Sequence, residues 1–257
     1  MSAATPAEVM TVVAARSLAN GARCFVGIGL PSEAANLARR LHAPDLVLIY
    51  ESGTIGAKPD VLPLSIGDGE LAETADTVVS VPEIFSYWLQ AGRIDVGFLG
   101  AAQLDRFANL NTTVIGAYDT PRVRLPGAGG APEIAAWARQ VFVMLRHSPT
   151  TLVERLDFVT SPGFLDGGNA RERRGLAGAG PTRVITDRGV LEPDPESKEL
   201  VLTHVHPGVD AEAVRRATGW PLRVADPLQV TAPVTDRELA VLRDLLARTT
   251  RAHGTAT

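Results

Sequence analysis

The chain has 257 residues, of which 45% are hydrophobic and 21% are charged, and these values are typical of a soluble globular protein. Its formal net charge of −4 excludes a basic field that would attract nucleic acid or an anionic membrane, so we expect neither as a partner. The single cysteine, Cys24, excludes an intrachain disulfide and favours a cytoplasmic location. The sequence also shows no signal peptide at its start, and no apolar stretch comes near the ~20 residues of a membrane span.

The N-terminal part of the chain alternates between segments typical of helices and segments typical of strands. Thr5, Pro6 and Glu8 form a capping box with proline at the first helical position, and they predict a helix that ends near Gly21. Helical spacing also predicts a helix capped by Ser32 and helices at residues 81–92 and 131–138. Short apolar runs predict strands at residues 24–26, 46–50, 77–81, 93–100, 111–116 and 140–146. This alternation predicts an α/β fold with an open, mostly parallel sheet flanked by helices.

The sequence pattern changes beyond Ser161. Residues 161–181 are rich in glycine and charge and predict a long ordered loop or flap. A C-terminal hairpin at 183–205 is predicted, followed by helices at 211–220 and 235–249, and we expect the hairpin and the last helices to form a cap on the sheet. The final residues are expected to be frayed. No linker is visible, so residues 1–257 are predicted to form a single domain.

Three glycine-containing loops are predicted at the carboxyl edge of the sheet, where parallel sheets bind ligands. The first offers free backbone amides to an anion, the second places a carboxylate directly after a buried strand, and the third can form an amide nest for an oxyanion. Each loop taken alone can be a simple packing turn. A ligand-binding site is favoured only because all three loops are predicted at the same edge of the sheet. The loops are Gly27, Ile28, Gly29, Leu30 and Pro31; Glu51, Ser52 and Gly53; and residues 126–131, which include Gly129 and Gly130.

Competing interpretations of Glu51 follow from these residues alone. Glu51 follows Gly27 at close to the ~20-residue offset of the ribose-binding acid in a dinucleotide site, which would make the protein an NAD-dependent oxidoreductase. Against this, Ser32 stands where the third glycine of that fingerprint is required. Alternatively, Glu51 is a nucleophile that attacks a thioester carbonyl to give an acyl anhydride and then a glutamyl thioester. A third interpretation is a non-catalytic protein that binds a metabolite as a sensor.

Several unusual strings occur in the order found in one enzyme family. They are VGIGLP, LIYESGTIG, FLGAAQLDRFANLNTTVIGAYD, RLPGAGGAPEIA and FVTSPGFLDGGNARERRGLAGAGP. With these strings, which cover most of residues 20–190, the chain resembles the β (B) subunit of family I CoA-transferases. The resemblance is closest to the glutaconate type and to the 3-oxoacid (3-oxoadipate) type.

The resemblance implies the CoA-transferase fold, which is NagB/RpiA-like, and a role for each loop. Glu51 matches the catalytic glutamate that becomes a glutamyl-CoA thioester, and Gly27 to Pro31 match the loop that contacts CoA. Gly129 and Gly130 match the loop that contacts CoA and the oxyanion. Coenzyme A is then a co-substrate, with no permanently bound cofactor and no metal.

The same resemblance implies a partner and a class of substrate. Such enzymes work with an α (A) subunit, the active cleft lies between the two chains, and higher oligomers of α–β units are expected. The substrates would be an acyl-CoA and a dicarboxylate such as glutaconate or 3-oxoadipate.

A few other polar residues have both functional and structural interpretations. The amides of Gln103, Asn109 and Asn111 can bind a substrate carboxylate or satisfy loop backbone. The arginines of residues 171–174 can clamp a phosphate, although a solvated loop or subunit contact is favoured. For His204 and His206 we expect a structural role.

Overall fold

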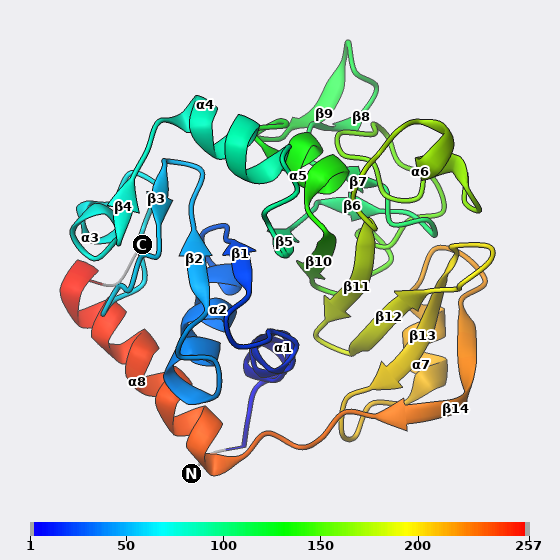
Figure 1. Ribbon diagram of the computed structural model, residues 1–257. Coiled ribbons are helices and arrows are strands. Elements are labelled where there is room, and N and C mark those ends of the chain that lie inside the picture. Colours follow the sequence, from blue (N-terminus) through cyan, green and yellow to red (C-terminus); the bar gives the residue numbers. More distant parts are fainter. Residues whose placement is uncertain (1–2, 255–257) are drawn as a thin grey trace. The chain divides into compact units, whose positions relative to one another are not determined.

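The structure is a computed structural model in which residues 3–254 are described, and the chain divides into two compact units (Figure 1). Unit 1 contains the residues up to Phe98 together with those from Pro233 onward, and unit 2 contains Leu99 to Ala232. The expectation of a single domain stays a prediction.

The sheet of unit 1 has a parallel core and an antiparallel edge. The strand order is β5-β1-β2-β3-β4, in which β1 runs parallel to both β2 and β5, whereas β3 runs antiparallel to both β2 and β4. The predicted strand at 77–81 is shorter than expected, because Ser80 already caps the next helix. The strands are β1 (Arg23–Phe25), β2 (Val47–Ile49), β3 (Thr54–Ile55), β4 (Thr77–Val78) and β5 (Val96–Leu99).

The helices of unit 1 include the first and the last helix of the described chain. The predicted capping box at Thr5 is confirmed, and the helix predicted at 81–92 begins as a single α-helical turn and continues as a π-helix. In the π-helix, the Gln90 amide donates to the Phe85 carbonyl at 2.8 Å, a bond that spans five residues. The helices are α1 (Pro6–Arg16), α2 (Leu30–Leu41), α3 (Gly69–Glu73), α4 (Val81–Glu83), η1 (Ile84–Leu89) and α8 (Asp236–His253).

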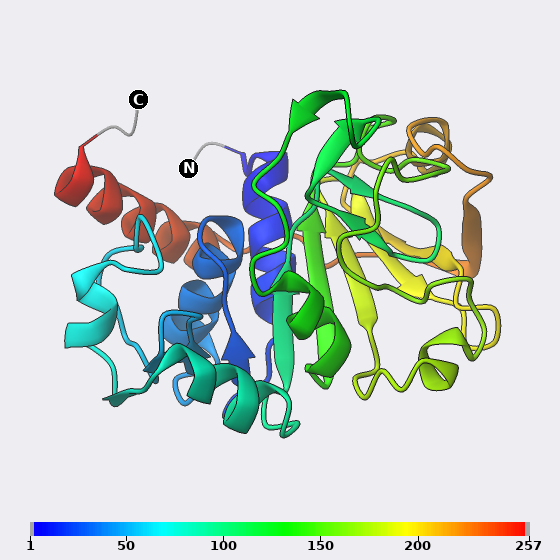
Figure 2. The same cartoon turned by 90° about the horizontal axis from the view of Figure 1, so that it is seen from above.

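The C-terminal helix α8 packs beside α1 and α2 (Figures 1 and 2). Two ion pairs fasten it to α1, because Arg16 Nε lies 2.7 Å from Glu238 and Arg243 Nε lies 2.6 Å from Glu8. The expectation that the last helix joins the hairpin in one cap is therefore wrong, since α8 belongs to unit 1 and the hairpin to unit 2. Of the tail predicted to be frayed, residues 255–257 lie outside the described residues.

The main sheet of unit 2 has the order β10-β11-β12-β13-β14. Its outer pairs β10–β11 and β13–β14 are parallel, and the pairs between them are antiparallel. The predicted hairpin is confirmed as β12 and β13, whereas β14 was not predicted. These strands are β10 (Gln140–Leu145), β11 (Pro181–Thr186), β12 (Gly189–Pro193), β13 (Leu200–Val205) and β14 (Arg223–Val230).

Short elements complete unit 2. The predicted strand at 111–116 is split between two small hairpins, β6–β7 and β8–β9, of which β8–β9 stands at the top of Figure 1. The segment 161–181 is an ordered loop, as predicted, with one short helix in it. These elements are β6 (Gln103–Leu104), β7 (Leu110–Asn111), β8 (Val114–Gly116), β9 (Pro121–Arg124), α5 (Ala131–Trp137), α6 (Ala170–Arg173) and α7 (Ala211–Arg216).

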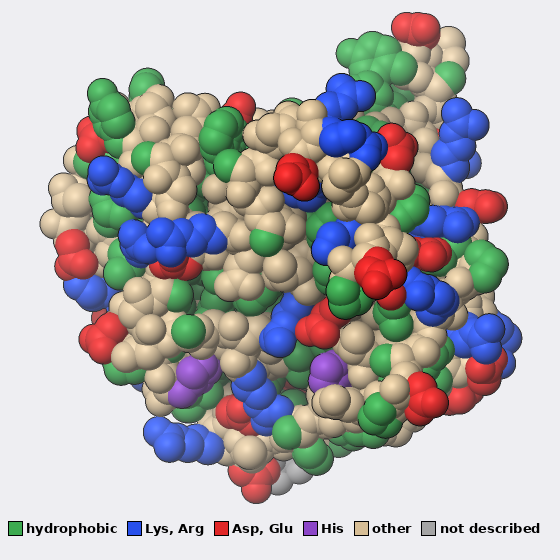
Figure 3. Space-filling view, turned by 45° about the vertical axis from the view of Figure 1, so that its right-hand side comes forward, with side chains coloured by type: hydrophobic (Ala, Val, Ile, Leu, Met, Phe, Trp, Pro, Cys, Tyr) green, Lys and Arg blue, Asp and Glu red, His purple; other side chains and the backbone are tan. Residues whose placement is uncertain are grey.

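Among the described residues, no helix combines the length and the apolar character that a membrane crossing requires. On the face seen in Figure 3, acidic and basic side chains are interspersed rather than gathered by sign. This mixture agrees with the absence of a basic binding field in the sequence.

Candidate active site

Glu51 lies at the tip of a tight turn between β2 and β3. The Gly53 amide donates to the Tyr50 carbonyl at 3.0 Å, and the Tyr50 amide donates to the Thr54 carbonyl at 3.0 Å. These bonds close the hairpin and place Glu51 and Ser52 at its tip. The Glu51 residue is half-buried, so it is neither sealed in the core nor fully in water.

Two buried hydroxyl groups follow Glu51 closely in the chain. Within the described residues, Ser52 Oγ and Thr54 Oγ1 have no hydrogen-bond partner. A buried hydroxyl without a partner costs roughly 1–3 kcal/mol, so such groups are expected where a further molecule supplies the missing bond. Sequence reasoning did not single out these two hydroxyls, because nothing in a turn sequence shows which hydroxyls stay unpaired.

Gly53 allows this turn to pack against the chain just after β4. Its φ of 109° is unfavourable for any residue with a side chain, and an added Cβ would lie 2.0 Å from the Val79 carbonyl oxygen. The Val79 amide donates to the Gly53 carbonyl at 2.9 Å. The position of Glu51 therefore depends on a glycine two residues further along.

Tyr50 anchors the other side of the turn. Its side chain is fully buried, its hydroxyl lies 3.1 Å from Ser32 Oγ on α2, and burial raises its pKa. Ser32 was predicted to cap α2, and this prediction is wrong, because the helix begins earlier, with Gly29 as N-cap and Pro31 in the first turn. Ser32 instead joins the helix to the residue before Glu51.

The loop from Gly27 to Pro31 adjoins the Glu51 turn. It follows β1, the Glu51 turn follows β2, and the two strands are parallel with Phe25 opposite Ile49. The two loops therefore leave the sheet at the same edge, as predicted. A Cβ added at Gly27 or Gly29 would meet no atom within 4 Å, so a ligand can approach this backbone closely.

The third predicted loop, residues 126–131, lies in unit 2. The Gly127 amide donates to the Thr112 carbonyl at 2.8 Å, and Thr112 Oγ1 donates to the Gly127 carbonyl at 2.8 Å. Gly129 has a φ of 49° and open space at its Cβ position, and Gly130 is the N-cap of α5. That this loop shares an edge with Glu51 stays a prediction.

The three amide side chains considered as substrate ligands are engaged within unit 2. Asn111 Nδ2 donates to Gln103 Oε1 at 2.7 Å, and Gln103 Nε2 donates to Asp157 at 2.9 Å. Asn109 Oδ1 accepts from the amides of Gly163 and Leu165 at 2.8 and 3.0 Å. The alternative role of supporting loop backbone is therefore the one that the structure shows for these side chains.

The arginines of residues 171–174 divide into two kinds. Arg171 is buried and donates to backbone carbonyls, so it is not available to clamp a phosphate. Arg173 and Arg174 are exposed and line a cavity of about 840 Å³ together with Arg106 and the apolar residue Leu165.

The two histidines near the end of β13 have structural contacts. His206 is buried, with Nε2 2.8 Å from the Thr186 carbonyl and Nδ1 3.0 Å from Thr231 Oγ1, and burial lowers its pKa. His204 Nδ1 lies 2.9 Å from Thr203 Oγ1. Over residues 3–254, no group of three or more potential metal ligands is arranged to hold a metal ion.

Comparison with known proteins identifies the family of this chain. The chain matches the family described as Coenzyme A transferase over residues 7–217. The chain belongs to the coenzyme A transferase family. The resemblance found in the sequence motifs is thereby confirmed, and the dinucleotide interpretation loses its support.

Individual members of the coenzyme A transferase family match nearly the whole chain. It is 62% identical over 254 residues to the B subunit of 3-oxoadipate CoA-transferase from Pseudomonas knackmussii, covering 99% of this chain and 98% of that protein. It is 37% identical over 235 residues to the B subunit of glutaconate CoA-transferase from Acidaminococcus fermentans, covering 89% and 88% of the two chains. The crystal structure of glutaconate coenzyme A-transferase from Acidaminococcus fermentans superimposes with a TM-score of 0.88 at 32% identity, covering 94% of each chain, which confirms the predicted fold.

Proposed function

We propose that this chain is the β subunit of a heteromeric CoA-transferase and that Glu51 is its nucleophile. The observation that carries the proposal is the position of Glu51. It lies at the tip of a turn, half-buried, at the same sheet edge as a glycine loop whose backbone is open to a ligand. A reactive carboxylate needs this combination of partial shelter and access to a bound thioester.

The reaction is a double exchange at two carbonyl groups. The Glu51 carboxylate attacks the thioester carbonyl of an acyl-CoA, the C–S bond breaks, and an acyl–glutamyl anhydride and the CoA thiolate result. The thiolate attacks the γ-carbonyl of Glu51, which forms the glutamyl-CoA thioester and releases the first carboxylate. The acceptor carboxylate then attacks this thioester, which forms a second anhydride and expels the CoA thiolate. The thiolate attacks the acceptor's carbonyl group in this anhydride, which gives the new acyl-CoA and frees the Glu51 carboxylate.

The surrounding groups have supporting roles in this scheme. Each attack places a negative charge on a carbonyl oxygen, and backbone amides of Gly129 and Gly130 are our candidates to donate hydrogen bonds to it. Residues Gly27 to Pro31 are our candidates to contact CoA, and the open space at Gly27 and Gly29 supports this. Coenzyme A is a co-substrate in this scheme, and no permanently bound group is required.

The intermediates require protection from water, because an anhydride or a thioester would otherwise hydrolyse. Glu51 is half-exposed in this chain, so we propose that an α subunit covers it in a complex of α–β units. Both relatives named above are B subunits of their enzymes, which supports a partner chain. We place this complex in the cytoplasm, in keeping with the single, buried cysteine.

We propose 3-oxoadipate as the acceptor, because the relative with 62% identity belongs to a 3-oxoadipate CoA-transferase. Glutaconate is the second candidate, supported by the relative with 37% identity and by the structural match. Rates of CoA transfer to the two dicarboxylates, measured with one preparation of the complex, separate these candidates.

The nucleophile is tested by substitution in the complex with the α subunit. Glu51→Ala is expected to lower kcat by at least about a thousand-fold, because alanine has no carboxylate to carry the acyl intermediate. Glu73→Ala is the matched control, since Glu73 is an exposed carboxylate of α3 in the same unit, and it should keep full activity. A Glu51→Ala complex that turns over at the normal rate rules out the mechanism.

A further inference from the structure

Arg171 in α6 is a buried cation that binds only backbone carbonyl groups. The residue is 6% exposed, and over residues 3–254 no carboxylate forms an ion pair with it. Burial lowers its pKa to about 10, so the guanidinium still carries its charge at neutral pH. A buried charge without a counter-ion is costly, so its hydrogen bonds must compensate for the lost water.

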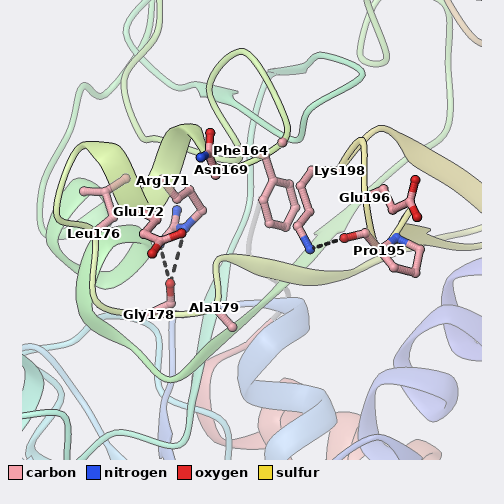
Figure 4. Close-up of a pocket in the computed structure, with 11 residues that line it drawn as sticks. Phe164, Asn169, Arg171, Glu172, Leu176, Gly178, Ala179, Pro195, Glu196 and Lys198 are labelled. Atoms are coloured by element: carbon pink, nitrogen blue, oxygen red, sulfur yellow. Dashed lines mark hydrogen bonds between the residues drawn. The ribbon is translucent and has the colours of Figure 1, made fainter.

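All five N–H groups of the guanidinium are accounted for by carbonyl oxygens from three segments of unit 2. Nε and Nη2 donate to the Gly178 carbonyl at 3.3 and 3.0 Å, as the dashed lines in Figure 4 show. Nη1 donates to the carbonyls of Gly163 and Pro162 at 2.7 and 3.4 Å. Nη2 also donates to the Ala135 carbonyl at 2.9 Å.

The fork-shaped guanidinium is required by this arrangement. A lysine ammonium has only three donors and no planar fork, so it cannot reproduce these five hydrogen bonds to four carbonyl oxygens. The surroundings are also fitted to the arginine, because a Cβ added at Gly180 would lie 2.9 Å from Arg171 Nε and 3.0 Å from its Cζ. The site therefore recognises this one side chain.

The Ala135 carbonyl links Arg171 to the glycine loop of the proposed active site. Ala135 lies in the last turn of α5, and Gly130 is the N-cap of the same helix. A helix of only seven residues is not stable by itself, so its neighbours set its position. Further bonds hold the same end of α5, since the Gly178 amide donates to the Ala136 carbonyl at 2.9 Å.

We propose that Arg171 is a positioning residue for CoA transfer, holding α5 so that the amides of Gly129 and Gly130 point correctly at the reacting carbonyl. This inference rests on the proposed function, and it adds a residue that touches neither substrate nor Glu51. Its consequence is a loss of rate rather than of substrate affinity, because a displaced oxyanion donor is felt mainly in the transition state.

The test compares Arg171→Lys with Arg173→Lys in the complex with the α subunit. Arg173 is exposed in the same helix, so Arg173→Lys is the matched control and should leave kcat unchanged. For Arg171→Lys, assayed at a temperature where circular dichroism shows the complex folded, kcat should fall about tenfold or more while KM for acyl-CoA changes less than about twofold. Normal kcat in a folded Arg171→Lys complex overturns the proposal.

A rescue experiment separates positioning from general stability. Arg171 lines a cavity of about 410 Å³ together with Phe164 and Lys198, so a small cation can reach the space that a shortened side chain would leave (Figure 4). Millimolar ethylguanidinium should restore part of kcat in Arg171→Ala, and ethylammonium should not. Equal effects of both ions, or failure of both variants to fold, overturn the positioning role.

The failure of this inference is distinguishable from failure of the proposed function. If Glu51→Ala is inactive while Arg171→Lys has normal kinetics, the nucleophile stands and the role of Arg171 is wrong. If Glu51→Ala is active, the proposed function itself is wrong whatever Arg171→Lys does.

Discussion

At Gly53 one added methyl group is enough to disrupt the turn that carries Glu51. The φ of 109° excludes a side chain there, and so does the Val79 carbonyl oxygen, which would lie 2.0 Å from an added Cβ. Gly27 at the neighbouring loop is different, because an added Cβ meets no atom within 4 Å. The two glycines of the proposed site thus have separate physical roles, one in the fold and one in access for a ligand.

We predict that Gly53→Ala lowers the free energy of unfolding by at least about 2 kcal/mol, since both backbone strain and overpacking oppose it. Gly27→Ala should change it by less than about 1 kcal/mol, while raising KM for acyl-CoA in the complex because the methyl group occupies the open space. Urea denaturation of both variants measures the difference in stability. Equal midpoints for the two variants would show that the Glu51 turn does not depend on Gly53.

Sequence reasoning at the residue scale predicted Glu51 and the glycine loops as site residues, but it did not predict the residues that support them. Glu51 was singled out because a carboxylate directly follows a short apolar strand there, within a distinctive string. The role of Ser32 was missed, because serine near a helix start is most often a cap, and its contact with Tyr50 crosses from helix to strand. The buried guanidinium of Arg171 was also unpredictable, since its partners are all backbone carbonyl groups, which no residue type marks in a sequence.

At the scale of elements, the ends of β10 and β13 each lead into a buried histidine. His147 follows β10, with Nε2 2.9 Å from Thr218 Oγ1 and its own amide donating to Asp187 at 2.7 Å. His206 follows β13 and binds Thr186 and Thr231. Burial, and secondarily the charge of Arg188, lowers the pKa of His147 to about 4.

This shift predicts an acid-sensitive stability of the folded chain. In the unfolded chain a histidine has a pKa of about 6.5, so below that pH the unfolded chain binds a proton that folded His147 does not. The stabilisation is therefore fully present above pH ~6.5 and is lost as pH falls toward the folded pKa of about 4. For one such group, the free energy of unfolding changes by at most about 1.4 kcal/mol per pH unit.

His147→Gln should flatten this slope between pH ~6.5 and ~4.5, because glutamine does not titrate. The measurement is the free energy of unfolding of wild type and variant across that range. Comparing the two proteins cancels the contribution of buried carboxyls such as Asp105, whose pKa is raised by burial. Parallel curves for wild type and variant would mean that His147 titrates alike in the folded and unfolded chain.

Elements with a local cause were predicted best. Helices were expected to start near Thr5 and Thr235, and both do, because the hydrogen bonds of the capping box at each residue span only three residues. The π-helix of residues 84–89 could not be predicted, since its apolar pattern is also that of an α-helix. The strand β14 was missed because its residues are half-buried or exposed and show no buried apolar run.

At the scale of the whole molecule, long-range contacts decide what local patterns leave open. The last helix was assigned to the wrong part of the chain, because the ion pairs that fasten α8 to α1 join residues at opposite ends of the sequence. The α/β class did follow from the alternation of strands and helices, and the structural match with a TM-score of 0.88 confirms it. The acyl substrate and the partner chain leave no comparable local signal.

The glutamyl-CoA thioester on Glu51 is the central claim, and reductive trapping tests it most directly. The complex of this chain with its α subunit is incubated with acyl-CoA without acceptor, then treated with borohydride, and the peptide that contains Glu51 is examined by mass spectrometry. We predict that the γ-carboxyl of Glu51 is reduced to a primary alcohol, that the peptide loses the corresponding mass, and that activity is lost in proportion. An unchanged Glu51 peptide from an enzyme that is active before the treatment, or a reduced carboxyl at another position, would contradict the account.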